Sequence, residues 1–223
     1  MSEQPESGVD ERPVILLGAG GHARVLLSAL RRAGREVLFA TGLPTPGARQ
    51  RIDHLAIRPG ADAEAMDPQG VELALGVGTI APSPRRAEIV AHWQARGFRF
   101  ATVIDPTALV CAPINLGAGC QILAGAIVQP GATIGAHCIV NTGARVDHDA
   151  SLGAFVHLAP GVILSGNVHI GEGAHLGTGC SVVQGVSIGA RALVAAGAVV
   201  IRDVDDDQRV AGVPARSMRG HGR

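Results

Sequence analysis

His148 stands between two carboxylates, Asp147 and Asp149, in a short stretch of small and polar residues. An imidazole has a pKa near neutrality, so it can take a proton from an attacking nucleophile at physiological pH. A carboxylate bonded to the second ring nitrogen fixes the tautomer and raises the basicity of the ring. The sequence therefore predicts a general base at His148, oriented by one of its two neighbours, Asp149 or Asp147. The alternative is an exposed residue without a role.

A six-residue repeat must position this histidine. Stepping by six from Ile104 to Val200 meets a Val, Leu or Ile every time, which makes 17 hexads without an insertion. The position four residues further on is always Ala, Cys, Val or Ile. Such a pattern predicts short strands joined by corners, with three hexads closing one triangular coil of about 18 residues. We expect a β-helix over residues 104–205.

The register of the repeat predicts which of the other reactive residues point into the core and which lie near a corner. Cys120, Cys138 and Cys180 fall on the inward small-residue position, so we expect them to pack in the core and not to react or bind metal. His148 occupies a slot near a corner, where its side chain can leave the core. Gly166 follows His148 by three whole hexads and should stand one coil above it on the same corner.

The first hundred residues have a different pattern. An apolar strand at 13–17 is followed by the loop Gly18-Ala19-Gly20-Gly21-His22 and a helix to about residue 34, which together form a phosphate-cradling unit. Further strands are expected at 36–40, 71–75 and 98–104, with a helix at 84–96 and mostly loop over 42–70. No acidic residue ends the second strand, which disfavours NAD. The pattern predicts a small α/β (Rossmann-like) domain.

These observations give four predicted segments. They are a disordered tail (1–11), an α/β domain (12–103), a β-helix domain (104–205) and a tail packed on the last coil (206–223). Nineteen basic and 19 acidic residues balance, so nucleic acid is not an expected partner. The N-terminus lacks the features of a signal peptide, and no apolar run is long enough to span a membrane. We expect a cytoplasmic protein that is not inserted in a membrane.

The glycine loop, the uninterrupted repeat, the segment Asn141–Asp149 and the closing Gly212-Val213-Pro214-Ala215-Arg216 occur together. In that combination the chain resembles the hexapeptide-repeat sugar acetyltransferases, which include nucleotide-4-amino-sugar N-acetyltransferases and sialic acid O-acetyltransferases. The resemblance covers residues 13–218. It implies a left-handed parallel β-helix, a homotrimer, acetyl-CoA as co-substrate and no metal. It also implies that residues 12–103 bind a nucleotide sugar and that residues 104–205 form the acyltransferase domain.

The resemblance also assigns roles to individual residues. His148 matches the general base and Asp149 its partner. Gly166 matches a backbone N–H near the thioester carbonyl, and His157 a contact to acetyl-CoA. Thr178 and Ala196 match positions along the pantetheine arm; they are three hexads apart but on a neighbouring corner, which fits a ligand groove between adjacent protomers. The substrate-binding matches are Gly18, Gly20, Gly21, His22 and Asn141.

The expected reaction is N-acetylation of a nucleotide-linked 4-amino-4,6-dideoxysugar, a step of polysaccharide biosynthesis. The alternatives are O-acetylation of sialic acid or a related sugar, and a non-catalytic trimer that binds a nucleotide sugar. A metal-dependent carbonic anhydrase is disfavoured, because no two successive histidines between His137 and His175 are five residues apart. The acidic pair that often ends the second strand in this family is absent, so UDP, GDP and dTDP all stay open.

Overall fold

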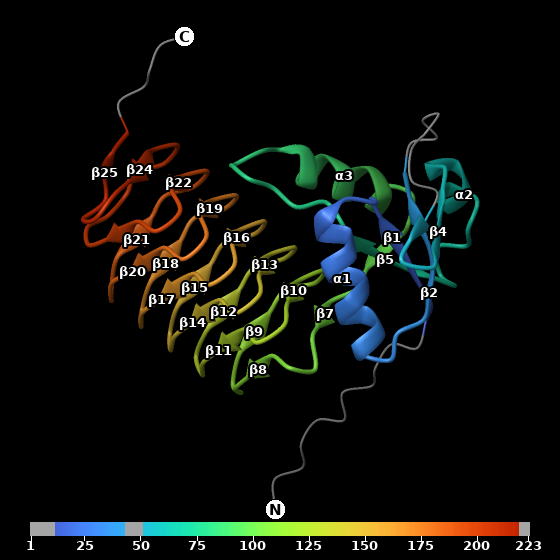
Figure 1. Ribbon diagram of the computed structural model, residues 1–223, viewed down its shortest axis with the longest axis horizontal. Helices are drawn as coiled ribbons and strands as arrows, with labels where there is room; N and C mark the ends of the chain where they lie inside the picture. The colour runs from blue at the N-terminus through green and yellow to red at the C-terminus, as the bar shows by residue number, and fades with distance from the viewer. Residues whose placement is uncertain (1–11, 43–50, 219–223) are drawn as a thin grey trace, which may run out of the picture.

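A computed structural model describes residues 12–42 and 51–218; the predicted disordered tail lies outside these ranges. The chain forms an α/β part and a long β-helix that lie side by side (Figure 1). Within the described ranges, no helix is long and apolar enough to cross a membrane.

The α/β part is built on one six-stranded sheet with the order β3-β4-β2-β1-β5-β6. All neighbours pair in parallel except β3 and β4, which are antiparallel. The strands are β1 (Val14–Leu17), β2 (Val37–Thr41), β3 (Arg51–Ile52), β4 (Leu55–Arg58), β5 (Glu72–Leu75) and β6 (Arg99–Phe100). The parallel order explains why β1 and β5 are fully buried, because helices cover both of their faces.

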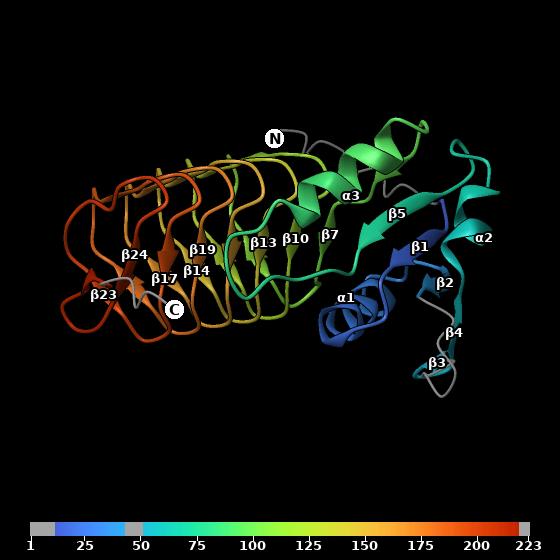
Figure 2. The same ribbon diagram turned by 90° about the horizontal axis from the view of Figure 1, so that it is seen from above.

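Three helices complete this part: α1 (Gly21–Arg32), α2 (Gly60–Glu64) and α3 (Arg85–Gln94). Helix α1 covers one face of the sheet, and α2 and α3 lie over the other (Figure 2). The predicted strands and long helices are present. Of the stretch 42–70, predicted to be mostly loop, residues 43–50 lie outside the described ranges, and over 51–70 the prediction was wrong. Within that range the structure has β3, β4 and α2, and the apolar Ile52, Leu55 and Ala63 anchor them in the two cores.

Seventeen two-residue strands, β7 to β23, follow one another at a constant spacing of six residues and confirm the predicted repeat. They stack into three parallel ladders in which each strand pairs with the strand three hexads further along the chain. The first face consists of β7 (Val103–Ile104), β10 (Gln121–Ile122), β13 (Ile139–Val140), β16 (His157–Leu158), β19 (His175–Leu176) and β22 (Leu193–Val194), extended by β24 (Arg209–Ala211) and β25 (Arg216–Ser217).

The other two faces have the same construction. The second face consists of β8 (Leu109–Val110), β11 (Ile127–Val128), β14 (Arg145–Val146), β17 (Ile163–Leu164), β20 (Ser181–Val182) and β23 (Val199–Val200). The third face consists of β9 (Asn115–Leu116), β12 (Thr133–Ile134), β15 (Ser151–Leu152), β18 (His169–Ile170) and β21 (Ser187–Ile188).

The interior of the coils is an aliphatic core that contains both repeat positions. Cys120, Cys138 and Cys180 are fully buried in it, so their predicted packing role is confirmed. Ile104, the first residue of the repeat, is 39% exposed because no coil lies beneath it. The predicted inward pattern therefore holds from the second coil onward.

The two parts share a core and an ion pair. Leu123 and Ile139 of the β-helix belong to the same hydrophobic cluster as helix α1. Arg32, at the end of α1, forms an ion pair with the fully buried Asp105, which also accepts hydrogen bonds from the backbone and side chain of Thr107. These contacts fix the position of the glycine loop relative to the coils.

Candidate active site

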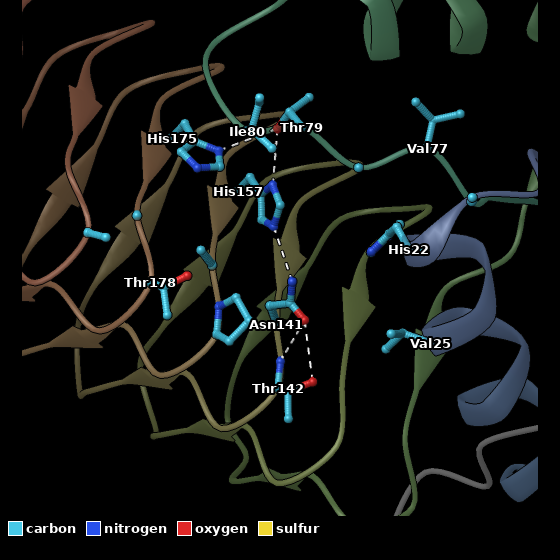
Figure 3. A pocket seen from close by; sticks show the side chains of 18 of the residues that line it. His22, Val25, Val77, Thr79, Ile80, Asn141, Thr142, His157, His175 and Thr178 are labelled. Carbon is cyan, nitrogen blue, oxygen red and sulfur yellow. Dashed lines mark hydrogen bonds between the residues drawn. The ribbon is translucent and has the colours of Figure 1, made fainter.

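A cavity of about 930 Å³ lies between the α/β part and the first face of the β-helix (Figure 3). The loops after β1 and β5 form one wall, and the corners between the first and second faces form the other. Its lining residues include Gly18, Gly20, Gly21, His22, Thr79, Ile80, Arg85, Asn141, Thr142, His157, His175, Thr178 and Ala196.

The glycine loop places the amino end of helix α1 at this cavity. Gly18 has a φ of +106°, and its backbone N–H donates to the hydroxyl of Thr41 (3.1 Å). Gly20 caps α1 without a side-chain hydrogen bond, and no acidic residue occupies the first turn of the helix. Free N–H groups and the positive end of the helix dipole favour an anion at such a terminus.

His22 begins this helix and is held by the β-helix. Gln121 donates its amide N–H to the carbonyl of Leu75 (2.9 Å), so its amide oxygen accepts from His22 Nε2 (2.7 Å). The Nδ1 atom of His22 is therefore an acceptor. Burial lowers the pKa of His22, which keeps the ring neutral.

His157 and His175 lie one above the other on β16 and β19, with ring centroids 4.8 Å apart. Each is 5% exposed. His157 Nδ1 lies 3.0 Å from the hydroxyl of Thr79, and its Nε2 lies 3.3 Å from Asn141 Nδ2. Burial and the neighbouring His175 lower the pKa of His157 to about 2, so this ring is neutral and both of its nitrogens are occupied.

His148 lies on a different corner, between the second and third faces. Its Nδ1 is 2.8 Å from Asp149 Oδ2, while Asp147 accepts a bond from the backbone N–H of His148 (2.7 Å). The side chain is 54% exposed. The hydrogen bond to Asp149 raises the pKa of His148, and the charge of Asp147 adds to that effect. Such a ring is exposed, basic and fixed in one tautomer.

The predicted site residues thus fall into two groups. Gly18, Gly20, Gly21, His22, Asn141, His157, Thr178 and Ala196 line the cavity at the first face. His148, Asp149 and Gly166 lie on the next corner and are not among its lining residues. A Cβ built on Gly166 would be 2.5 Å from His148 Nε2, so these two residues are in direct contact across adjacent coils. One protomer does not bring the two groups into one cavity.

Sequence reasoning missed four residues of the cavity region: Thr79, Arg85, Gln121 and His175. The spacing of three hexads between His157 and His175 could have revealed one of them, because equal slots stack on one face. Thr79 and Arg85 lie outside the repeat and carry no such signal. Among the described residues, no group of three or more His, Cys, Asp or Glu side chains could hold a metal ion.

Part of the β-helix matches a known family of repeats. Residues 113–148 match the model described as bacterial transferase hexapeptide (six repeats). A search of curated proteins returned no match.

Solved structures match nearly the whole chain. The acetyltransferase domain of PglB from Neisseria gonorrhoeae, also solved with acetyl coenzyme A, superposes with a TM-score of 0.86 at 32% identity, over 93% of this chain and 100% of that chain. PerB from Caulobacter crescentus, solved with CoA and GDP-perosamine, gives a TM-score of 0.85 at 34% identity, over 93% and 97%. WeeI from Acinetobacter baumannii, at 22% identity and a TM-score of 0.85 over 93% and 100%, supports the fold alone. The chain belongs to the hexapeptide-repeat sugar acetyltransferase family.

Proposed function

We propose that this protein transfers the acetyl group of acetyl-CoA to the amino group of a nucleotide-linked 4-amino-4,6-dideoxysugar. The observation that carries the proposal is the His148–Asp149 pair, joined by a 2.8 Å bond with Gly166 one coil above. A basic, exposed and oriented imidazole suits the removal of a proton from an attacking amine.

The reaction needs no acyl-enzyme. The sugar amine attacks the thioester carbonyl while His148 Nε2 takes the amine proton, so the C–N bond forms and the carbonyl oxygen gains negative charge. Among the described residues no backbone group accepts the N–H of Gly166, which is free to donate to that oxygen. The tetrahedral intermediate collapses with cleavage of the C–S bond, and the proton held by His148 passes to the departing thiolate.

The donor site requires a second copy of the chain. Thr178 and Ala196 line the cavity corner, whereas His148 and Gly166 lie on the next corner. In a homotrimer with parallel axes, the corner of one protomer that carries Thr178 and Ala196 would face the corner of its neighbour that carries His148 and Gly166. Acetyl-CoA would then lie in the groove between the two protomers. The second face supports this assembly, because its outward Leu109 is 55% exposed and its outward Ile163 is 41% exposed.

The acceptor site lies at the glycine loop. The uncapped amino end of α1 and the guanidinium of Arg85 border the same cavity, and both suit a diphosphate. We assign residues 12–103 to nucleotide-sugar binding and residues 104–205 to acyl transfer. The ligand bound to PerB, GDP-perosamine, is a nucleotide-linked sugar and supports this acceptor class. N-acetylation is favoured over O-acetylation because a protein 35% identical to this chain is a GDP-perosamine N-acetyl transferase.

A turnover screen tests the proposal. Purified protein is mixed with acetyl-CoA and a panel of UDP-, GDP- and dTDP-linked 4-amino sugars, with sialic acid as the O-acetyl alternative, and free thiol is measured. We expect thiol release with at least one amino sugar, and loss of about 10²-fold or more in kcat for His148→Ala. His169→Ala, a change to an exposed histidine on the third face, is the matched control. Acetylation of sialic acid alone would overturn the N-acetyl assignment, and a wild-type protein that neither binds nor hydrolyses acetyl-CoA would overturn the whole proposal.

A further inference from the structure

Thr79 reaches from the loop between β5 and α3 to the first face of the β-helix. Its hydroxyl lies 3.0 Å from His157 Nδ1 and 3.4 Å from His175 Nδ1 (Figure 3). One side chain of the α/β part thus joins two buried rings on adjacent coils. The His175 ring makes no other hydrogen bond with the described residues.

The backbone N–H of Thr142 determines which atom donates in each hydrogen bond of this chain from Asn141 to His175. Asn141 Oδ1 accepts the N–H of Thr142 (2.8 Å), so Asn141 Nδ2 must donate to His157 Nε2. His157 is therefore protonated at Nδ1 and donates to Thr79. The hydroxyl of Thr79 has one proton, which is then available for His175 Nδ1. It follows that His175 carries its own proton on Nε2.

This arrangement leaves the two rings with different capacities. His157 has both nitrogens engaged within the protein, so it has no free N–H for a ligand. His175 keeps an Nε2–H, and its ring lines the cavity next to Gly177 and Thr178 of the same coil. Burial lowers the pKa of His175, so the ring is a neutral donor. A neutral N–H in a largely apolar wall suits a carbonyl oxygen.

We propose that Thr79 is a positioning residue that holds His175 with its Nε2–H directed at a carbonyl oxygen of the pantetheine arm of acetyl-CoA. The inference rests on the proposed function, because it assigns a contact of the same co-substrate. It adds a loop of the α/β part to the elements that set the affinity for the acetyl donor. That loop would then serve both substrates, since Arg85 lies at its far end.

Steady-state kinetics test the contact. Thr79→Val removes the hydroxyl at nearly constant volume and His175→Leu removes the donor. Each should raise the KM for acetyl-CoA and the Kd for free CoA by about 3- to 10-fold, the value of one neutral hydrogen bond, with kcat changed less than about twofold. Thr79→Ser and His175→Gln keep a hydroxyl and an N–H donor and should recover most of the affinity. Thr133→Val and His169→Leu, on the third face, are the matched controls.

Nuclear magnetic resonance of ¹⁵N-histidine-labelled protein reads the tautomers directly. We expect the wild type to show His157 protonated at Nδ1 and His175 protonated at Nε2, and Thr79→Val to shift the Nδ1 signals of both rings. Thr133→Val should leave both unchanged. Unmoved Nδ1 signals in Thr79→Val would contradict the proposal, because they would mean that the hydroxyl orients neither ring. The KM for acetyl-CoA distinguishes a positioning role from a merely structural one, which would lower stability without changing that KM.

The outcomes separate the two levels of inference. A wild-type protein that neither binds CoA nor transfers acetyl groups overturns the proposed function, and this contact with it. An active wild type whose Thr79→Val and His175→Leu variants keep the wild-type KM for acetyl-CoA overturns the contact alone. So does a rise confined to the KM of the sugar. Folding of each variant is checked by circular dichroism and gel filtration.

Discussion

Gly166 stands directly above His148, one coil further along the corner between the second and third faces. A Cβ on Gly166 would lie 2.5 Å from both Cε1 and Nε2 of the imidazole. Real side chains do not approach so closely, so only glycine leaves this ring in place. Among the described residues no backbone group accepts the N–H of Gly166, which the proposed mechanism assigns to the carbonyl oxygen of the thioester.

Gly166→Ala is expected to displace His148 and to lower kcat by about 10²-fold, because misplacement of a catalytic group by about 1 Å has an effect of that size. The Kd for CoA should change little. Turnover and calorimetric titration measure the two quantities. Gly60→Ala is the control, since its Cβ would meet no atom within 4 Å. A Gly166→Ala enzyme with normal kcat would show that His148 is not the base.

Asp149→Asn should move the pH profile. A general base acts in its deprotonated form, so activity rises with pH through the pKa of His148, which the bond to Asp149 raises. Asparagine keeps an acceptor oxygen but removes the negative charge, so the pKa of His148 falls, and the ascending limb of kcat/KM should shift to lower pH while the plateau drops by about tenfold or more. Asp147→Asn keeps an oxygen for the backbone N–H of His148 and should shift the limb less. Equal shifts in the two variants would assign the partner role to both.

Buried neutral histidines should make the protein sensitive to acid. The native pKa of His157 is lowered to about 2 by burial, whereas in the unfolded chain this ring takes up a proton near pH 6.5. The unfolded state therefore binds more protons below pH 6.5. As the pH is lowered further, the free energy of unfolding should decrease by about 1.4 kcal/mol per pH unit because of this residue. His22 and His175 act in the same direction.

Denaturant unfolding at pH 7.5, 6.5 and 5.5 measures that slope at fixed protein concentration. His157→Asn should reduce the slope by the contribution of one proton, while His169→Asn, at an exposed site, should leave it unchanged. An unaltered slope in His157→Asn would mean that His157 is protonated in the native state.

The second face offers a test of assembly. Ile163 points outward from β17, next to Arg145 of β14 in the register of the ladder. Ile163→Arg would place two guanidinium groups side by side on an apolar surface, which should dissociate the proposed trimer and abolish turnover. Sedimentation velocity and the thiol assay follow the two effects. Thr133→Arg on the third face should change neither, and an active Ile163→Arg monomer would exclude a shared site.

Much of the architecture was predictable because the repeat is strict. An aliphatic residue every six positions from Ile104 defines the strands, their register and the burial of Cys120, Cys138 and Cys180. The stacking of Gly166 above His148 follows from the same period of three hexads per coil. Periodicity converts sequence distance into spatial distance, so contacts within the coils can be calculated by counting.

The rest could not be derived by counting. Thr79 meets His157 across 78 positions, and the contact depends on how the α/β part packs on the first face. The pairing of Arg32 with Asp105 has the same origin. The strands and short helix within 51–64 were missed because their apolar residues are few and are interrupted by turn-forming residues. Such contacts depend on tertiary packing, which local patterns do not encode.

The unbroken stacking of the coils fixes the spacing of residues along the helix axis. Paired strands lie about 4.8 Å apart, so a corner residue can be moved along the helix axis only in steps of that size, each step being three hexads long. The ion pair between Arg32 and Asp105 fixes the α/β part at the first coil of the β-helix. The number of coils between Asp105 and His148 therefore fixes the distance along the helix axis between the α/β part, to which we assign nucleotide-sugar binding, and the proposed general base.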